Sequence, residues 1–411
     1  MPVRLFMMKN AVAPSLCFCL LVVAGGCSAT ENTLHSLPAS AQRATAVRGN
    51  GGSLGPVLST SDGGQIFGFD VDQNGKDGVL ASASYTEISV QTFNTVTGKI
   101  TKTFGVKTGR PVQKGDDYVA DGIFAGDVGL IDFQKAGKPG VSPAHDIYHA
   151  MDPVSGKKFT GPWSPTIKLF NILQNAVNQS TTTSVVYGYE RIGSDAPKLV
   201  VSDVAKNSVS NVIALDPGKF SLADAPQLAQ DTVKNLAVIA TSPSAGGAGG
   251  PPPVIATVGL SSGKVAEFNG VNCPGSVGCG YANGIAYDSQ SGIACTTTEL
   301  DGGIEFYNVA QETGFHELLP NGGGQFYAGA YVASDPVHQL FLIAQPFSST
   351  SPSGSSVQVY GENGTLVESI NGFSFTDAGD LVIPVKIAIN PNRRIGWVNG
   401  PKVNQLQEFS Y

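Results

Sequence analysis

The sequence predicts an all-β protein built from repeated four-stranded antiparallel sheets. Short β-prone runs alternate with turns rich in Asp, Gly and Ser through most of the chain, which is the pattern of successive hairpins. One complete unit of four such runs lies at 282–319, and related units recur at the spacing typical of propeller blades. We therefore expect a β-propeller of about seven four-stranded blades. A six-bladed ring is the alternative, and a pair of β-sandwiches is the competing fold.

The first strand of the unit carries a repeated phrase. Residues 285–288, 332–335 and 387–390 each consist of a β-branched residue, Ala, a variable residue and then Asp or Asn. We expect the small Ala where innermost strands converge on the propeller axis. The Asp or Asn is expected to close the following turn by hydrogen bonding to its own backbone. The matching third strands are predicted at 303–307, 356–360 and 405–409.

Fainter copies of the unit extend toward the N-terminus. Third strands are predicted there at 89–93, 147–150, 212–215 and 265–268. Because the chain ends inside a third strand, we expect residues 55–60 to supply the outer strand of the last blade and close the ring. A single helix is predicted at 165–178, where apolar residues share one face: Ile167, Phe170, Leu173 and Val177.

Residues 1–26 have the features of an export signal. Two basic residues precede an apolar run that is too short to span a bilayer comfortably. The run ends in small residues before Cys27, which resembles the lipobox of bacterial lipoproteins, although Ala24 stands where Leu is usual. The resemblance implies lipidation of Cys27 and a membrane anchor. Because Ser28 follows where a retention signal has Asp, it also implies the outer membrane, facing the periplasm or the cell surface. A plain secretory signal cut near Ala29 is the alternative.

The remaining chain divides into a tether and one domain. Residues 27–54 are polar, show no apolar periodicity and are expected to form a flexible tether. Residues 55–411 are expected to form the propeller, because a ring of repeats is a single unit even at this length. The net charge is −7 and no Lys/Arg cluster occurs, so nucleic-acid binding is not expected.

Cysteine usage supports an oxidising compartment. Cys273 and Cys279 bracket a short loop, Pro-Gly-Ser-Val-Gly, that a disulfide could close after export. Cys295 is then unpaired. It is predicted to be a buried free thiol on an inner strand.

Residues 70–78 are the sharpest metal-binding candidate. Asp70, Asp72, Asn74 and Asp77 place oxygen side chains around a Gly turn, and such oxygens are what Ca²⁺ prefers. The run begins like an EF-hand loop but has Ala81 where the bidentate acid belongs. It also resembles the Asp-rich turns of FG-GAP propeller repeats, in which the last Asp usually lies one residue later. The competing interpretation is a hairpin without metal.

Two further motifs are interpreted as strands and turns. His145 and His149 resemble a zinc-binding HExxH with Asp for Glu, but on a strand these residues lie too far apart for one zinc ion. Residues 259–263 match G-x-S-x-G, the nucleophile elbow of hydrolases. Because a strand rather than a helix is predicted after them, a Ser-Gly hairpin is expected.

The phrase Asn283-Gly284-Ile285-Ala286-Tyr287-Asp288 resembles the inner strands of NHL, YVTN-type and SMP-30/gluconolactonase-like propellers. SMP-30-like enzymes hold a divalent metal on the axis, and only Asn283 matches one of their ligand positions. We expect a lipid-anchored propeller that binds or scaffolds a protein or glycan outside the cytoplasm, rather than an enzyme. The alternative is a metal-dependent SMP-30-like hydrolase.

Overall fold

The computed structural model describes most of the chain after residue 50, all of it within the unit Leu37–Tyr411. The described residues are 51–73, 75–83, 88–106, 118–125, 128–135, 145–151, 171–178, 183–189, 196–203, 208–217, 219–220, 227–241, 254–268, 282–298, 303–318, 332–345, 355–374 and 386–411.

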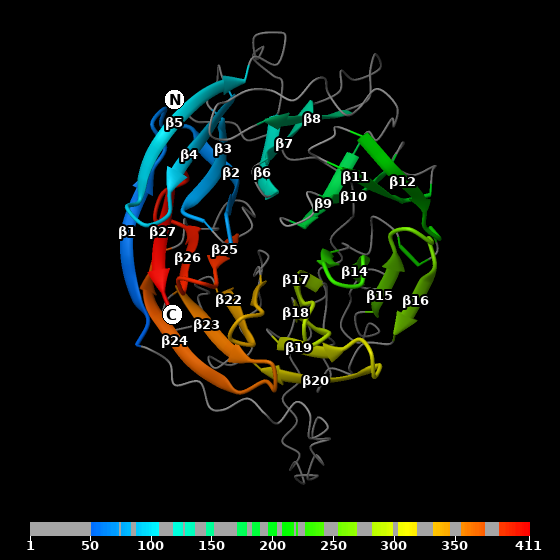
Figure 1. Ribbon diagram of the computed structural model, residues 1–411. Coiled ribbons are helices and arrows are strands. Elements are labelled where there is room, and N and C mark those ends of the chain that lie inside the picture. Colours follow the sequence, from blue (N-terminus) through cyan, green and yellow to red (C-terminus); the bar gives the residue numbers. More distant parts are fainter. Residues whose placement is uncertain are drawn as a thin grey trace, which may run out of the picture. The chain divides into compact units, whose positions relative to one another are not determined.

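The described strands form antiparallel sheets, six with four strands and one with three (Figure 1). We name each sheet as a blade after its innermost strand. Written from the innermost strand outward, the first three blades are the β2 blade with β2 (Gln65–Val71), β3 (Asp77–Ala83), β4 (Ile88–Asn94) and β5 (Lys99–Val106); the β6 blade with β6 (Tyr118–Ala125), β7 (Val128–Lys135) and β8 (His145–Met151); and the β9 blade with β9 (Asn171–Asn178), β10 (Thr183–Tyr189), β11 (Lys198–Asp203) and β12 (Ser208–Ala214). The next two are the β13 blade with β13 (Gln227–Asp231), β14 (Leu236–Thr241), β15 (Val254–Gly259) and β16 (Val265–Phe268), and the β17 blade with β17 (Ala282–Asp288), β18 (Ile293–Thr298), β19 (Gly303–Asn308) and β20 (Thr313–Leu318). The last two are the β21 blade with β21 (Val332–Asp335), β22 (Leu340–Gln345), β23 (Ser355–Gly361) and β24 (Leu366–Phe373), and the β25 blade with β25 (Ile387–Asn390), β26 (Ile395–Asn399), β27 (Gln405–Ser410) and β1 (Ser53–Ser59).

The innermost strands form a closed ring. Each contacts the innermost strand of the next blade, in the order β2, β6, β9, β13, β17, β21, β25 and back to β2. Figure 1 shows the blades arranged around a common centre in this order. The predicted all-β propeller fold is therefore confirmed, and the complete unit predicted at 282–319 is the β17 blade.

The two ends of the described chain meet in the last blade. β1 pairs antiparallel with β27, and the register places Ser53 opposite Ser410 and Ser59 opposite Gln405. β1 is therefore the outer strand of the β25 blade, the position expected for residues 55–60. This pairing joins residues more than three hundred positions apart, and it gives the β25 blade its fourth strand.

The hydrophobic core lies between neighbouring blades rather than at one centre. One buried cluster joins the β9 and β13 blades, and similar clusters join each following pair up to the β25 and β2 blades. In the last of these, Trp397 is fully buried and its ring meets Phe93 edge-on at 5.2 Å between centroids. Since each blade packs on both neighbours, removing apolar volume from one interface weakens the closure of the ring.

Two of the predicted third strands are instead outer strands. Residues 212–215 overlap β12, and residues 265–268 are β16, each the fourth strand of its blade. The third strands of these blades are β11 and β15, which are largely buried, whereas most residues of β12 are exposed or partly buried. A short β-prone run does not distinguish these places, because the propensity for a strand is the same in both.

The predicted helix at 165–178 is wrong over its described part. Residues 171–178 form β9, which pairs antiparallel with β10. The apolar spacing that suggested a helix is short enough to fit a strand as well. Pairing with β10 on one edge and contact with β13 in the next blade favour the strand.

Candidate functional site

The turn after the innermost strand is built the same way in several blades. Asp231, Asp288 and Asp335 end their strands, and the Oδ1 atom of each accepts hydrogen bonds from the backbone N–H groups two and three residues later. Asn390 accepts one such bond from the N–H of Arg393. All four side chains are at most 1% exposed. The predicted role of this Asp or Asn in closing its own turn is confirmed.

Each of these turns ends in a residue with left-handed backbone. The φ angles are 57° at Asn235, 78° at Gly292, 58° at Gln339 and 51° at Arg394. Only one of the four is glycine, so the other three carry a side chain in a conformation that L-residues seldom adopt. The turn therefore fixes the direction in which each of these side chains leaves the ring. We call the face formed by these turns the tight-turn face.

The same turns connect neighbouring blades. Asp335 in the β21 blade accepts a hydrogen bond from the Tyr411 hydroxyl of the β25 blade at 2.9 Å. Asn390 in the β25 blade donates through Nδ2 to the backbone oxygens of Asp72 and Gly75 in the β2 blade, at 2.9 and 3.0 Å. The turn residue of one blade thus holds the next blade in register.

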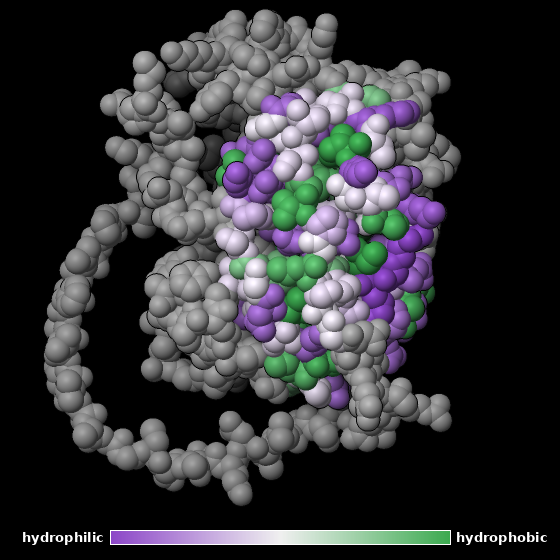
Figure 2. Space-filling model, turned by 90° about the vertical axis from the view of Figure 1, so that its left-hand side faces the viewer, coloured by the Kyte–Doolittle hydropathy of each residue, from purple (hydrophilic) through white to green (hydrophobic). Residues whose placement is uncertain are grey.

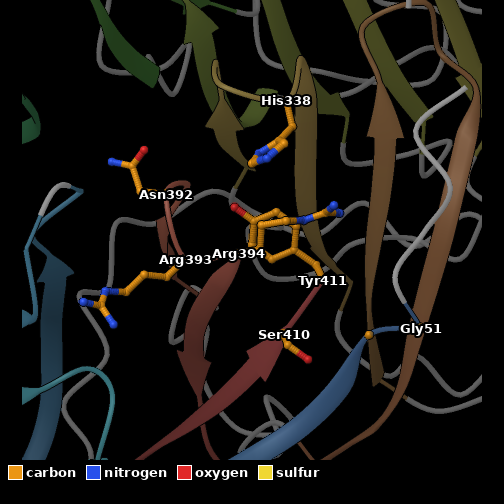
Figure 3. A pocket seen from close by; sticks show the side chains of 8 residues that line it. Gly51, His338, Asn392, Arg393, Arg394, Ser410 and Tyr411 are labelled. Atoms are coloured by element: carbon orange, nitrogen blue, oxygen red, sulfur yellow. The ribbon is translucent and has the colours of Figure 1, made fainter. Parts of the chain in front are cut away.

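A pocket opens between two of these turns and the meeting point of the chain ends (Figure 3). Its volume is about 350 Å³, which is within the usual range for small-ligand sites. It is lined by the two turns, the residues that precede β1 and the end of β27: His338, Asn392, Arg393, Arg394, Gly51, Gly52, Ser410 and Tyr411.

The floor of the pocket is a buried polar network. Tyr411 is 1% exposed, and the guanidinium carbon of Arg394 lies 5.4 Å from the centre of its ring. His338 Nδ1 lies 2.8 Å from Asp335 Oδ2, the atom that also accepts the Tyr411 hydroxyl. Burial, followed by the Asp335 carboxylate, raises the pKa of Tyr411 well above its ordinary value. The Tyr411 phenol therefore stays protonated and acts as a donor.

The pocket concentrates positive charge in an acidic protein. Both arginines of the described residues, Arg393 and Arg394, line it, whereas the whole chain carries a net charge of −7. Figure 3 shows Arg394 lying across Tyr411 below His338, while Arg393 extends toward the opposite side. Within the part of the chain that the structure describes, neither guanidinium forms an ion pair with a carboxylate. The arrangement is suited to holding an anion.

The predicted calcium loop is used as a connection between blades. Asp70 is the next-to-last residue of β2 and accepts from the N–H of Val71, and the N–H of Asp72 donates to the backbone oxygen of Asp77. Its backbone oxygens at Asp72 and Gly75, which could have served a cation, accept from Asn390. The hairpin interpretation accounts for all of these contacts.

Calcium binding at this loop stays a prediction. Asn74 lies outside the described residues. Burial and the neighbouring Asp72 carboxylate raise the pKa of Asp77, which is the direction two close acids produce. Across the described ranges, no group of three or more His, Cys, Asp or Glu side chains is placed to hold a metal ion.

The other predicted motifs fall on strands and turns. Residues 145–149 lie in β8, and residues 259–263 span the hairpin between β15 and β16, as expected. Asn283 lies in the innermost strand β17. Cys295 is a buried free thiol on β18, the second strand of its blade, as predicted, and burial raises the pKa of that thiol. Cys27, Cys273 and Cys279 lie outside the described residues.

Sequence reasoning missed the pocket. None of its lining residues was predicted as a site residue, because they come from four separated places in the chain. One local signal existed: Asn392, Arg393 and Arg394 follow an inner strand that ends in Asn390, so two adjacent arginines at a tight turn were visible. Which residues surround these two arginines depends on how the ring closes, because the other lining residues come from distant segments. No helix long and apolar enough to cross a membrane occurs in the described ranges.

The fold is similar to several solved propellers at low sequence identity. The chain aligns with U3-55K at a TM-score of 0.55 and 13% identity, covering 87% of this chain and 98% of that one. The WD40 repeats of RRP9 align at 0.54 and 13%, covering 86% and 96%. Raptor of Chaetomium thermophilum aligns at 0.56 and 11%, covering 92% of this chain but only 30% of Raptor.

At these identities the likeness shows the fold alone. No protein-family model matches the sequence, and the search of curated proteins gives no match. One of the similar structures, that of RRP9, is described as WD40 repeats. The resemblance to NHL, YVTN-type and SMP-30-like propellers stays a prediction.

Proposed function

We propose that this protein is a binding propeller that holds a protein partner on its outer side while a lipid at Cys27 anchors it to a membrane outside the cytoplasm. One observation carries the binding part of the proposal. Of the large apolar side chains exposed in the described residues, most gather on the blades around β1: Leu54, Val57, Val96, Leu366 and Val403, each 39–44% exposed.

This group lies on three neighbouring blades, with Val96 and Val403 in turns at opposite ends of the strands. Leu54 and Val57 are on β1, Leu366 is on the neighbouring β24, and β1 contacts β24. Val96 lies in the β4–β5 turn, whose Gly98 is close to Pro56 of β1. Figure 2 shows this side, with hydrophobic surface mixed among hydrophilic residues. Apolar groups in a polar frame are typical of a protein-binding surface.

The fold supports a scaffold role. The core lies between blades and takes Leu58 of β1 and Ile370 of β24, whereas other side chains of these outer strands face outward and can vary. One of the similar structures is a chain from a mitotic checkpoint complex, aligned at a TM-score of 0.51 and 11% identity, which shows a propeller of this kind inside a protein assembly. The exported location and the anchor rest on the sequence of residues 1–27.

A photo-crosslinking amino acid placed at Val57 in the source cells tests the binding part. Val212 on β12 is a matched control, because it is also a valine on an outer strand and is 44% exposed. The proposal expects a discrete crosslinked protein from position 57 and none from position 212. Equal yields from both positions, or no product from either, would contradict it. Incorporation of labelled fatty acid into the wild type but not into Cys27→Ala tests the anchor.

A further inference from the structure

We propose that the pocket beside Tyr411 binds a carboxylate group of an acidic segment in the protein partner, with Arg394 as its anchor and Arg393 at its rim. This inference rests on the proposed function and names the chemistry by which the partner is recognised. The pocket lies between the β21 and β25 blades at the start of β1, so it adjoins the apolar side described above.

The position of Arg394 is fixed before any ligand arrives. Its backbone is left-handed, with φ 51°, and its guanidinium lies over the Tyr411 ring. Its Nε atom is buried and has no hydrogen-bond partner in the structure. A buried donor without a partner is uncommon in proteins, and it makes this guanidinium the strongest candidate in the pocket for binding an acceptor. Because the side chain is already held in place, it loses little conformational entropy when a ligand binds.

The other polar groups of the pocket are already engaged. The Tyr411 hydroxyl donates to Asp335, His338 Nδ1 bonds to the same carboxylate, and Asn392 donates to the backbone oxygen of Gln73. The two guanidinium groups and the second ring nitrogen of His338 are therefore the side-chain groups left for a ligand.

The acids that border the pocket do not compete for these arginines. Asp335 is fully buried, and its two oxygens accept from two backbone N–H groups, Tyr411 and His338. Glu368 accepts from the N–H of Gly52 through one oxygen, and its other oxygen is buried without a hydrogen-bond partner. Within the described residues, no ion pair joins either acid to Arg393 or Arg394.

The geometry of the donors favours a carboxylate. A guanidinium presents parallel N–H groups that match the two oxygens of a carboxylate, and such charge-assisted pairs are among the strong hydrogen bonds of proteins. Arg393 is exposed, so it is suited to attract the ligand and contributes mainly through long-range charge. An acidic peptide offers both a carboxylate for Arg394 and further charges for Arg393.

Fluorescence anisotropy with a labelled hexaglutamate peptide tests this inference on the full chain. Arg394→Gln removes the anchor and keeps the turn, because Gln339 adopts the same backbone conformation at the equivalent position, with φ 58°. We expect Arg394→Gln to weaken binding about tenfold or more. Arg394→Lys keeps the positive charge but loses the parallel N–H groups of the guanidinium. Its affinity for the peptide should therefore lie between those of the wild type and Arg394→Gln.

Lys264→Gln is the matched control, because Lys264 is an exposed cation in the β15–β16 turn on the same face. It should change affinity by less than about twofold. A melting temperature for each variant separates lost binding from lost folding. Arg393→Gln should weaken binding less than Arg394→Gln and reduce its dependence on salt.

Several results would overturn the inference, and three of them come from the anisotropy assay itself. These are no binding of hexaglutamate, equal binding by Arg394→Gln and the wild type, or preferential binding of inorganic phosphate over the peptide. Hexaglutamine is the neutral comparison, and binding equal to hexaglutamate would also contradict a carboxylate site. Crosslinking from position 57 that persists in Arg394→Gln would leave the proposed function standing while the pocket inference fails.

Discussion

Glu362 should make the stability of the ring fall as the pH rises from mildly acidic to mildly alkaline. It lies in the β23–β24 turn, is 8% exposed, and accepts a hydrogen bond from Ser291 of the preceding blade at 2.7 Å. Burial, followed by the neighbouring Asp288, raises its pKa to about 8, from 4.5 for an unperturbed glutamate. At neutral pH, Glu362 is therefore mostly protonated in the folded protein.

The direction of the effect follows from proton uptake. Between pH 4.5 and about 8 the folded chain holds a proton at Glu362 that the unfolded chain has released, so the free energy of unfolding decreases with pH in this window. The contribution is fully present below the unfolded pKa and is lost as the pH rises through the folded pKa. The largest slope is about 1.4 kcal/mol per pH unit. Allowing for partial screening by solvent, we expect a total loss of about 2 kcal/mol.

Thermal unfolding followed by the fluorescence of the buried Trp397 measures this effect between pH 5 and 9. Glu362→Gln keeps the shape of the side chain and the acceptor for Ser291 but cannot release a proton. Its melting temperature should fall less with pH than that of the wild type, and the gap should be widest above pH 8. Glu408 has a pKa raised to about 7 by burial, so Glu408→Gln is the comparison that flattens only the lower part of the window. Parallel curves for the wild type and Glu362→Gln would refute the reasoning.

Three further predictions concern the packing of the ring, each measured as a change in melting temperature or urea midpoint. Gly396→Ala should destabilise by about 2 kcal/mol or more, because the added methyl would lie 2.1 Å from the ring of Phe409, and a neutral result would contradict that contact. Asn390→Ala should destabilise by about 3 kcal/mol, since it removes the two bonds to the β2 blade and one turn bond; a loss under about 1 kcal/mol would mean that water replaces them. Gly292→Ala should lose about 1 kcal/mol because its φ is 78°, and a gain in stability would be inconsistent with left-handed backbone there.

Local sequence patterns correctly predicted the turns and hairpins, because these are determined by residues close together in the sequence. The Asp or Asn at the end of an inner strand closes its turn through hydrogen bonds to backbone N–H groups two and three residues later. The turn after residues 285–288 could therefore be predicted from the local sequence. The same holds for the hairpin at 259–263, where strand, turn and strand follow one another. The helix predicted at 165–178 failed because apolar spacing over a short run fits a strand as well as a helix.

The order of strands within a blade was predicted less well. The misplaced third strands at 212–215 and 265–268 have the β-prone residues of a strand, but their place at the outer edge follows from which neighbour each one pairs with. Strand pairing joins segments that can lie far apart in the sequence, and the residues of a single β-prone run do not indicate which strand it pairs with. The β1–β27 pair shows the extreme case, because it links Ser53 to Ser410.

By itself, the sequence determined the all-β character, the repeated unit and the turns, since each depends on residues within one hairpin. Only the tertiary structure decided the pocket. His338, Arg394 and Tyr411 lie in different turns and strands and meet because the β21 and β25 blades pack face to face. Gly51 and Gly52 reach the same place because β1 completes the last blade. A site assembled at the junction of a closed ring depends on how the ring closes, and that is settled by packing between distant segments rather than by the local order of residues.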